Sequence, residues 1–172
     1  NLSNVNIHPM EVCSYNGCPM TSIAEAITYA ADSFPEYRGP RVLSMSLGAP
    51  TYSRIISYAV EYALSKDVTI IAAAGNSYLD TLNFYPAAFP GVISVGAIEN
   101  KRTWDNQSGR LEDKYDLAYF SNYGDKSLSV LAPGSDILSA LPASYIHLPP
   151  EAFEIIGVHL VKEEAYGFLS GT

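Results

Sequence analysis

The stretch VTIIAAAG at positions 68–75 is apolar almost throughout. A half-buried strand alternates apolar and polar residues, whereas a continuous apolar run is typical of a strand covered on both faces. Strands of that kind occur mainly in parallel sheets whose faces carry helices. The stretch therefore predicts a central strand of a parallel α/β sheet.

The segments around this strand alternate between helix and strand character. Residues 21–34 carry apolar side chains at helical spacing, with Thr21 or Ser22 as the expected N-cap and Glu25 in the first turn. A second helical pattern follows at 53–65. Further strands are expected at 7–12, 42–47, 91–98 and 128–134. This order predicts one α/β domain with a doubly wound, mainly parallel sheet and helices on both faces.

Two stretches match no element well. Residues 99–115 are polar, and residues 143–164 follow Pro142 and include Pro149 and Pro150. The second stretch contains EIIGVHLV, at 154–161, which suits a strand or a helix.

Composition narrows the class of protein. The chain has 172 residues, is 48% hydrophobic and carries a net charge of −8. A globular core is expected, and nucleic acid or anionic membrane is not expected as a partner, because both favour clustered Lys and Arg. No apolar run approaches the roughly 20 residues of a membrane span. The first ten residues do not resemble a signal peptide, so the gene product is expected to start further upstream.

Two cysteines lie five positions apart in CSYNGC, at 13–18. The sequence leaves two interpretations open, a small disulfide loop in an oxidising compartment or two free thiols. A zinc site is not expected, because further Cys or well-spaced His ligands would be needed.

Small residues gather where two of the predicted strands end. The strand at 42–47 ends in Ser46-Leu47-Gly48, and the strand at 68–75 ends in Gly75-Asn76. Parallel sheets bind ligands at the carboxyl ends of their strands. Without further information both stretches are ordinary strand ends and turns, but they mark the edge where a site is expected.

Six phrases occur in a fixed order along the chain: LSMSLG at 43–48, AAAGN at 72–76, YPAAFPGVISVGA at 85–97, YFSNYG at 119–124, VLAPGSDILSALP at 130–142 and YGFLSGT at 166–172. Together they resemble the subtilisin-like serine proteases, over about positions 5–142 and again from 166. The resemblance implies a subtilisin-like peptidase domain across 1–172, incomplete at both ends, with a loop insertion at 143–165. YFSNYG and VLAPG are interpreted as structural turns.

The resemblance also implies roles for individual residues. Asn76 matches the family's oxyanion-hole asparagine, whose side-chain amide donates to the oxygen that becomes negative during acyl transfer. Ser46, Leu47 and Gly48 match the strand that pairs with an extended peptide substrate, and glycine avoids obstructing its approach. The other pocket wall matches Ala73, Ala74 and Gly75. Phe84 lies near the position that sets pocket depth, so small or medium side chains are expected before the cleaved bond.

The catalytic triad of the family matches no residue of this chain. The family's Asp lies in a D-[ST]-G phrase and its His in an H-G-T phrase, both before the strand that matches 43–48. Neither phrase occurs here, and the nucleophilic Ser would follow Thr172 directly. His159, Asp136 and Ser170 supply the three residue types, but nothing in the sequence brings them together. The parent is therefore expected to be an extracellular or cell-envelope endopeptidase, and this chain alone is expected to be inactive.

Alternatives and ligands complete the expectations. A pseudoprotease that binds peptides without cutting them is the second interpretation, and a nucleotide-binding domain ranks far behind, because no Gly-rich phosphate loop follows a strand. Catalysis needs no cofactor. Structural calcium is compatible with the sequence, through the carbonyls that match a family site, those of Ala87, Phe89 and Val92, but carbonyl ligands leave no side-chain signature. Partners are an extended peptide or protein substrate and, in the parent, a propeptide or inhibitor.

Overall fold

A computed structural model describes residues 5–33, 40–140, 159–160 and 166–172. Its elements are, in chain order, α1 (Met20–Asp32), β1 (Arg41–Met45), α2 (Arg54–Ser65), β2 (Val68–Ala73), the short 3-10 helix η1 (Thr81–Asn83), β3 (Ile93–Asp105), β4 (Arg110–Leu117), β5 (Val130–Pro133), β6 (Ile137–Ala140), β7 (His159–Leu160) and β8 (Tyr166–Leu169). The expected insertion at 143–165 lies outside the described residues, apart from β7.

The main sheet has the order β1-β2-β3-β4, and β5 also pairs with β3. The β1–β2, β2–β3 and β3–β5 pairs are parallel, and only the β3–β4 pair is antiparallel. Met45 lies opposite Ala72, so β1 and β2 reach the same edge of the sheet with their carboxyl ends. The predicted α/β class with a mainly parallel sheet is confirmed.

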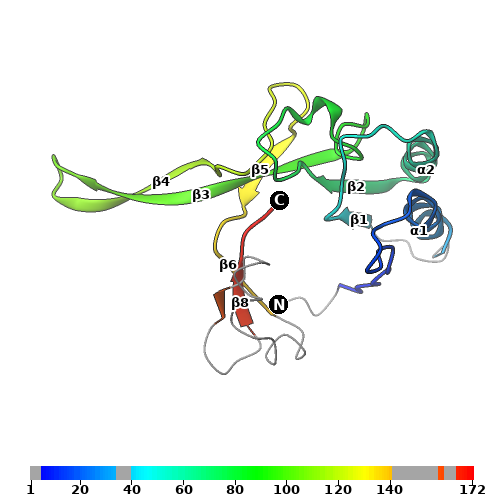
Figure 1. Ribbon diagram of the computed structural model, residues 1–172, viewed down its shortest axis with the longest axis horizontal. Coiled ribbons are helices and arrows are strands. Elements are labelled where there is room, and N and C mark those ends of the chain that lie inside the picture. Colours follow the sequence, from blue (N-terminus) through cyan, green and yellow to red (C-terminus); the bar gives the residue numbers. More distant parts are fainter. Residues whose placement is uncertain (1–4, 34–39, 141–158, 161–165) are drawn as a thin grey trace.

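The core lies between the two helices and one face of this sheet. On α1 the buried residues Ile23, Ile27 and Ala31 recur every four positions, which places them on one face of the helix. Leu43 and Ile70 oppose them from β1 and β2 and are almost fully buried. Among the described helices, α1 and α2 pack side by side on this face (Figure 1). They supply one of the two expected helical layers.

A long two-stranded ribbon formed by β3 and β4 projects from the sheet (Figure 1). Residues 99–115 were expected to form no regular element, and this prediction is wrong. Both faces of the ribbon are exposed, so its sequence lacks the apolar alternation that signals a half-buried strand. Gly109, at φ +64°, lies in the turn between the strands.

Two other local predictions are wrong. The segment 7–12 forms no strand, and Ile7 is 77% exposed. Helix α1 begins at Met20, ahead of both expected caps; Pro19 occupies the cap position, and its carbonyl accepts from Ile23 N–H at 3.1 Å. Cys13 and Cys18 form a disulfide, which decides between the two interpretations of the cysteine pair.

A small second sheet, of order β6-β8-β7, returns the chain to the main sheet. After β8, Gly171 N–H donates to the carbonyl of Gly134 at 2.8 Å. This bond holds the last residues of the chain beside the carboxyl end of β5. In the described part of the chain, no helix has the length and apolar character needed to cross a membrane.

Candidate active site

The expected site residues leave the sheet at one edge. Because β1 and β2 are parallel and in register, the segment after β1 and the segment after β2 emerge side by side. The first holds Ser46, Leu47 and Gly48, and the second holds Ala74, Gly75 and Asn76. The candidate residues therefore lie together at the carboxyl edge of the sheet, where parallel sheets bind ligands.

The side chain of Asn76 is held by Thr172, although 96 positions separate the two residues. Its Oδ1 accepts from the backbone N–H of Thr172 and from the Thr172 hydroxyl, each at 3.0 Å. The same hydroxyl oxygen accepts from Gly75 N–H at 3.0 Å. These bonds fix the plane of the amide, and therefore the direction of its Nδ2 donor.

Space around the Asn76 amide nitrogen is provided by Gly171. A Cβ atom at Gly171 would lie 3.3 Å from Nδ2, closer than an ordinary van der Waals contact. A side chain at position 171 would therefore crowd the amide, and glycine avoids this contact. In the sequence, this glycine and Thr172 lie in a phrase that matches the family, but no role was predicted for either residue.

Gly75 has φ +104°, a conformation that side chains disfavour. A Cβ at this position would also collide with the Asn122 amide and lie 2.7 Å from the Phe84 ring. Glycine is required here for both reasons. The turn after β2 can thus bend toward Thr172 while Phe84 packs beneath it.

Asn122 anchors the loop that follows β2. Its fully buried side chain accepts at Oδ1 from the N–H groups of Ser77 and Leu79, at 3.0 and 2.9 Å. Its Nδ2 donates to the carbonyl of Ala74 at 2.8 Å. One side chain therefore fixes the backbone on both sides of Asn76. In the sequence, the YFSNYG phrase was interpreted only as a turn. The role of its asparagine in holding the loop after β2 was missed.

Phe84 packs against both glycines of the expected pocket walls. A Cβ on Gly48 would collide with the Phe84 ring. The ring is brought there by the next residue, because Tyr85 and Ala49 exchange two backbone hydrogen bonds of 2.9 Å. Gly48 therefore makes room for Phe84, a reason for the glycine that sequence analysis missed.

The remaining pocket residues differ in how much of their backbone is available. Ala74 N–H donates to Val95 O at 2.9 Å, and its carbonyl accepts from Asn122, so the Ala74 backbone already has partners. Ala73 belongs to the parallel ladder of β2 with β3. Ser46 and Gly48 are exposed, and Leu47 is half-buried against the core. The segment after β1 is thus the more accessible wall.

Asp136 and Ser170 are neighbours, but not in a catalytic arrangement. Ser170 Oγ accepts from the backbone N–H of Asp136 at 3.0 Å, so the contact does not use the carboxylate. His159 lies in β7, and its backbone pairs with Phe168 of β8. The contact between Asp136 and Ser170 is therefore interpreted as structural, since it joins the start of β6 to the end of β8.

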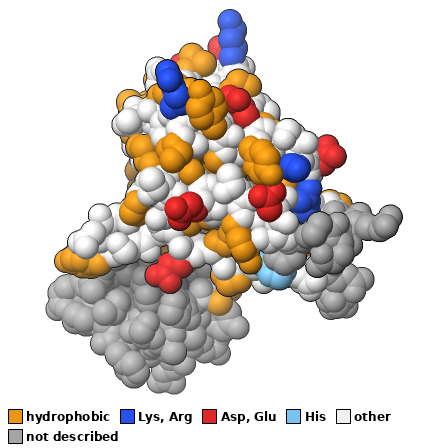
Figure 2. All heavy atoms as spheres, turned by 90° about the vertical axis from the view of Figure 1, so that its right-hand side faces the viewer, with side chains coloured by type: hydrophobic (Ala, Val, Ile, Leu, Met, Phe, Trp, Pro, Cys, Tyr) orange, Lys and Arg blue, Asp and Glu red, His pale blue; other side chains and the backbone are white. Residues whose placement is uncertain are grey.

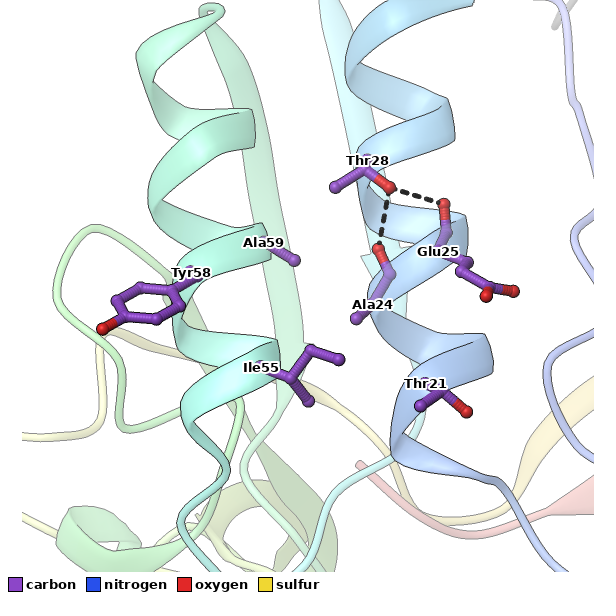
Figure 3. Close-up of a pocket in the computed structure, with 7 residues that line it drawn as sticks. All are labelled: Thr21, Ala24, Glu25, Thr28, Ile55, Tyr58 and Ala59. Atoms are coloured by element: carbon purple, nitrogen blue, oxygen red, sulfur yellow. Dashed lines mark hydrogen bonds between the residues drawn. The ribbon is translucent and has the colours of Figure 1, made fainter.

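A separate groove of about 350 Å³ lies between α1 and α2 (Figure 3). Ala24, Ile55 and Ala59 supply apolar lining, and Thr28 is turned back to its own helix by bonds to the carbonyls of Ala24 and Glu25. Figure 2 shows hydrophobic side chains interspersed with charged ones on this face. The groove shares no residue with the site around Asn76. Across the described ranges, no three His, Cys, Asp or Glu side chains gather as a metal site would need.

Comparison with known proteins shows which proteins this chain is similar to. The chain is 39% identical over 140 residues to a thermophilic serine proteinase of Bacillus sp. (strain AK1). The aligned region covers 80% of this chain and 30% of that protein. It is 37% identical over 124 residues to thermitase of Thermoactinomyces vulgaris, covering 72% and 37%. Its fold matches that of sphericase with a TM-score of 0.66 at 31% identity, over 93% of this chain and 47% of that structure.

The chain therefore spans about a third of the length of these curated relatives and under half of the solved structure. The sequence model of the subtilase family matches residues 2–172. This chain belongs to the subtilase family, the subtilisin-like serine proteases.

Proposed function

We propose that this chain is part of the peptidase domain of a serine endopeptidase and supplies its peptide-binding cleft and one oxyanion-hole donor. The observation that carries the proposal is the Asn76 amide, whose Oδ1 is bonded twice to Thr172. A donor fixed before the reaction needs little reorganisation when charge develops on the substrate oxygen. A protein that only bound peptides would have no use for such a donor.

The covalent steps need a serine nucleophile, a histidine base and an orienting aspartate. We propose that sequence outside these 172 residues supplies all three, with the serine immediately after Thr172. The serine oxygen attacks the peptide carbonyl carbon while histidine takes its proton. The carbonyl oxygen becomes negative, and Asn76 Nδ2 donates to it.

The substrate would lie in an extended conformation along the exposed segment after β1, adding a strand at Ser46–Gly48. The side chain before the cleaved bond would enter between this segment and Ala73–Gly75. Phe84 packs against Gly48 and Gly75 and so reduces the depth of that pocket. Small or medium side chains are the expected preference. In the parent, a propeptide or an inhibitor would occupy the same cleft.

The test compares two proteins, the 172-residue chain and a longer version that carries the flanking sequence of its parent. The longer version should cleave a suc-Ala-Ala-Pro-type chromogenic peptide and react with a fluorophosphonate probe at one serine. The chain alone should do neither. The pseudoprotease alternative predicts that the longer version binds the peptide without cleavage or labelling. Stoichiometric labelling of the 172-residue chain alone would contradict the proposal that the catalytic serine lies outside it.

Structural calcium is a further part of this proposal, through the carbonyls of Ala87, Phe89 and Val92. The Phe89 carbonyl accepts from Val92 N–H at 3.2 Å, and a carbonyl has a second lone pair for a cation. Calcium needs 6–8 oxygen ligands, so water or other groups must complete the shell. Added calcium should raise the thermal midpoint of the longer version, and magnesium at equal concentration should not. We propose an extracellular or cell-envelope location, which suits the Cys13–Cys18 disulfide.

A further inference from the structure

The outer edge of the ribbon strand β4 has no partner among the described strands. Beyond Ile98 the ribbon consists of β3 and β4 alone, and β4 pairs only with β3. It projects from the sheet on the side away from α1 and α2 (Figure 1). An unpaired strand of this length can pair with another chain.

The direction of the free backbone groups follows from one hydrogen bond at the base of the ribbon. Ala118 N–H donates to Ala97 O at 2.9 Å, so these two residues form a hydrogen-bonded pair of the antiparallel ladder. Bonded and non-bonded pairs alternate in such a ladder. The residues Leu111, Asp113 and Tyr115 therefore direct their backbone N–H and C=O groups away from β3.

One face of β4 carries charges that alternate in sign. They are Arg110, Glu112, Lys114 and Asp116, and their partners on β3 are Asp105, Thr103, Lys101 and Glu99, in that order. Two of these four cross-strand pairs are like-charged, which is unfavourable in a sheet. The lysines instead form ion pairs along their own strands, Lys114 with Asp116 at 3.6 Å and Lys101 with Glu99 at 2.8 Å. Of the four charged residues on this face of β4, only Arg110 has an opposite charge directly across on β3, that of Asp105.

We propose that β4 pairs antiparallel with β4 of a second copy of this chain, about a two-fold axis at Asp113. This register places Arg110 opposite the partner's Asp116 and Glu112 opposite the partner's Lys114. By symmetry each contact occurs twice, so all four cross-strand pairs on this face carry opposite charges. The two ribbons join into one four-stranded sheet, with an isologous interface.

The alternation selects this register. A shift of the pairing by two residues, which moves the axis to residue 112 or 114, brings Arg110 opposite the partner's Lys114 or Glu112 opposite the partner's Asp116. A shift of the pairing by one residue turns the charged face of one strand to the other face of its partner. Only the axis at Asp113 therefore uses the whole strand with complementary charges.

The opposite face of β4 fits the same register. Leu111 comes opposite the partner's Tyr115, and these side chains are 62% and 59% exposed in the single chain. At the axis the two Asp113 carboxylates come opposite one another, which is an unfavourable like-charged pair. Each carboxylate is bound to Arg102 of its own β3, whose positive charge offsets the repulsion. The carboxylate accepts from Asn100 Nδ2 at 3.0 Å and from Arg102 Nε at 3.2 Å, and these groups hold its pKa below the usual value.

Charge reversal tests the proposal in solution. Sedimentation velocity of the chain should show a monomer–dimer equilibrium that weakens as salt screens the ion pairs. Glu112→Lys and Lys114→Glu each place like charges opposite one another twice per dimer, and each should weaken the dimer about tenfold or more. The double variant E112K/K114E should restore it. Lys126→Glu makes the same change of net charge as Lys114→Glu, in an exposed loop, and should leave the equilibrium unaltered.

Cross-linking tests the register itself, independently of any association through other apolar surface. Asp113→Cys places the two thiols at the two-fold axis, so mild oxidation should give a disulfide-linked dimer. Asp116→Cys is the matched control, because its two copies lie six ladder positions apart, about 20 Å. Cys13 and Cys18 are bonded to each other and do not compete. A monomer at all concentrations, equal cross-linking of both variants, or no recovery in the double variant would overturn the proposal.

Discussion

The hydroxyl of Thr172 lies between Asn76 and Gly75, donating to the side-chain oxygen of the first and accepting from the backbone N–H of the second, each at 3.0 Å. A backbone bond from Thr172 to the same Asn76 oxygen adds a further constraint. The Asn76 amide is thus oriented from a distant part of the sequence. Its orientation should depend on Thr172 in a measurable way.

Thr172→Val removes the hydroxyl and keeps the backbone bond. In the longer version, under the proposed function, we expect kcat to fall about 2–10-fold with little change in KM, because one ordinary hydrogen bond is lost. Thr172→Ser keeps the hydroxyl and should retain most of the activity. Steady-state kinetics on one chromogenic peptide would measure all three proteins. A valine variant as fast as the parent would mean that the backbone bond alone orients the amide.

Asn76→Ala removes the donor itself. We expect kcat to fall by roughly 10²–10³ while KM stays within a few-fold, because the hydrogen bond strengthens only as charge develops. The magnitude is the one known for the oxyanion-hole asparagine of subtilisin, and it applies to Asn76 under the proposed function. Combining Asn76→Ala with Thr172→Val should add little further loss. Full additivity of the two losses would show that Thr172 acts on the substrate by a separate route.

Gly48→Ala should act through Phe84. The new methyl group would occupy the space of the ring, and overpacking of this kind costs about 1–3 kcal/mol of stability. Adding Phe84→Ala should relieve most of that loss, with a coupling of about 1 kcal/mol or more in a double-mutant cycle. Urea unfolding measures the stabilities. Independent effects of the two changes would contradict the contact.

Phe84→Ala alone should change substrate preference. Removing the ring deepens the pocket, so kcat/KM for a peptide with a bulky residue before the cleaved bond should rise relative to that for a small residue. The ratio of the two kcat/KM values, measured in parent and variant, reports this change. An unchanged ratio would place the specificity pocket elsewhere.

The sequence predicted the layered part of the fold, because its signals are local. The apolar run at 68–75 and the helical spacing at 53–65 agree with β2 and α2 to within about two residues. The ribbon was missed because its polar sequence has no burial pattern that would predict a strand. The cross-strand pairs of β3 and β4 form in spite of this composition. A strand was also expected at 7–12, but within the described ranges no strand pairs with this segment.

The sequence predicted a site around Gly75 and Asn76, which stays a prediction, and it did not predict the contacts of these residues. Gly75 and Asn76 were identifiable, since a strand end and a family phrase both mark them. The contact between Asn76 and Thr172 links residues 96 positions apart, and no local pattern encodes it. The role of Asn122 is equally non-local, because its side chain bonds residues more than 40 positions away.

Asn122→Ala should destabilise the loop after β2. The change leaves the N–H groups of Ser77 and Leu79 and the carbonyl of Ala74 without their partner. Because the side chain is fully buried, we expect a loss of about 2–4 kcal/mol, since each unsatisfied buried group costs about 1–3 kcal/mol and water can reach part of the loop. Asn100→Ala, on the exposed ribbon, is the control and should change stability little. Similar losses in the two variants would contradict this role.

The 172-residue chain by itself should be weakly stable, for a reason visible in β1. Leu43 and Met45 face the helices, whereas Val42 points to the opposite face of the sheet and is 58% exposed. Val130 and Leu131 of β5 are also about half exposed. Each large apolar side chain left in water loses roughly 1.5–3 kcal/mol of burial free energy, and the total free energy of unfolding of a domain is only about 5–15 kcal/mol. The chain should therefore bind a dye specific for apolar surface and unfold over a broad temperature range, and the longer version should do neither. A sharp thermal transition of the isolated chain without dye binding would contradict this prediction.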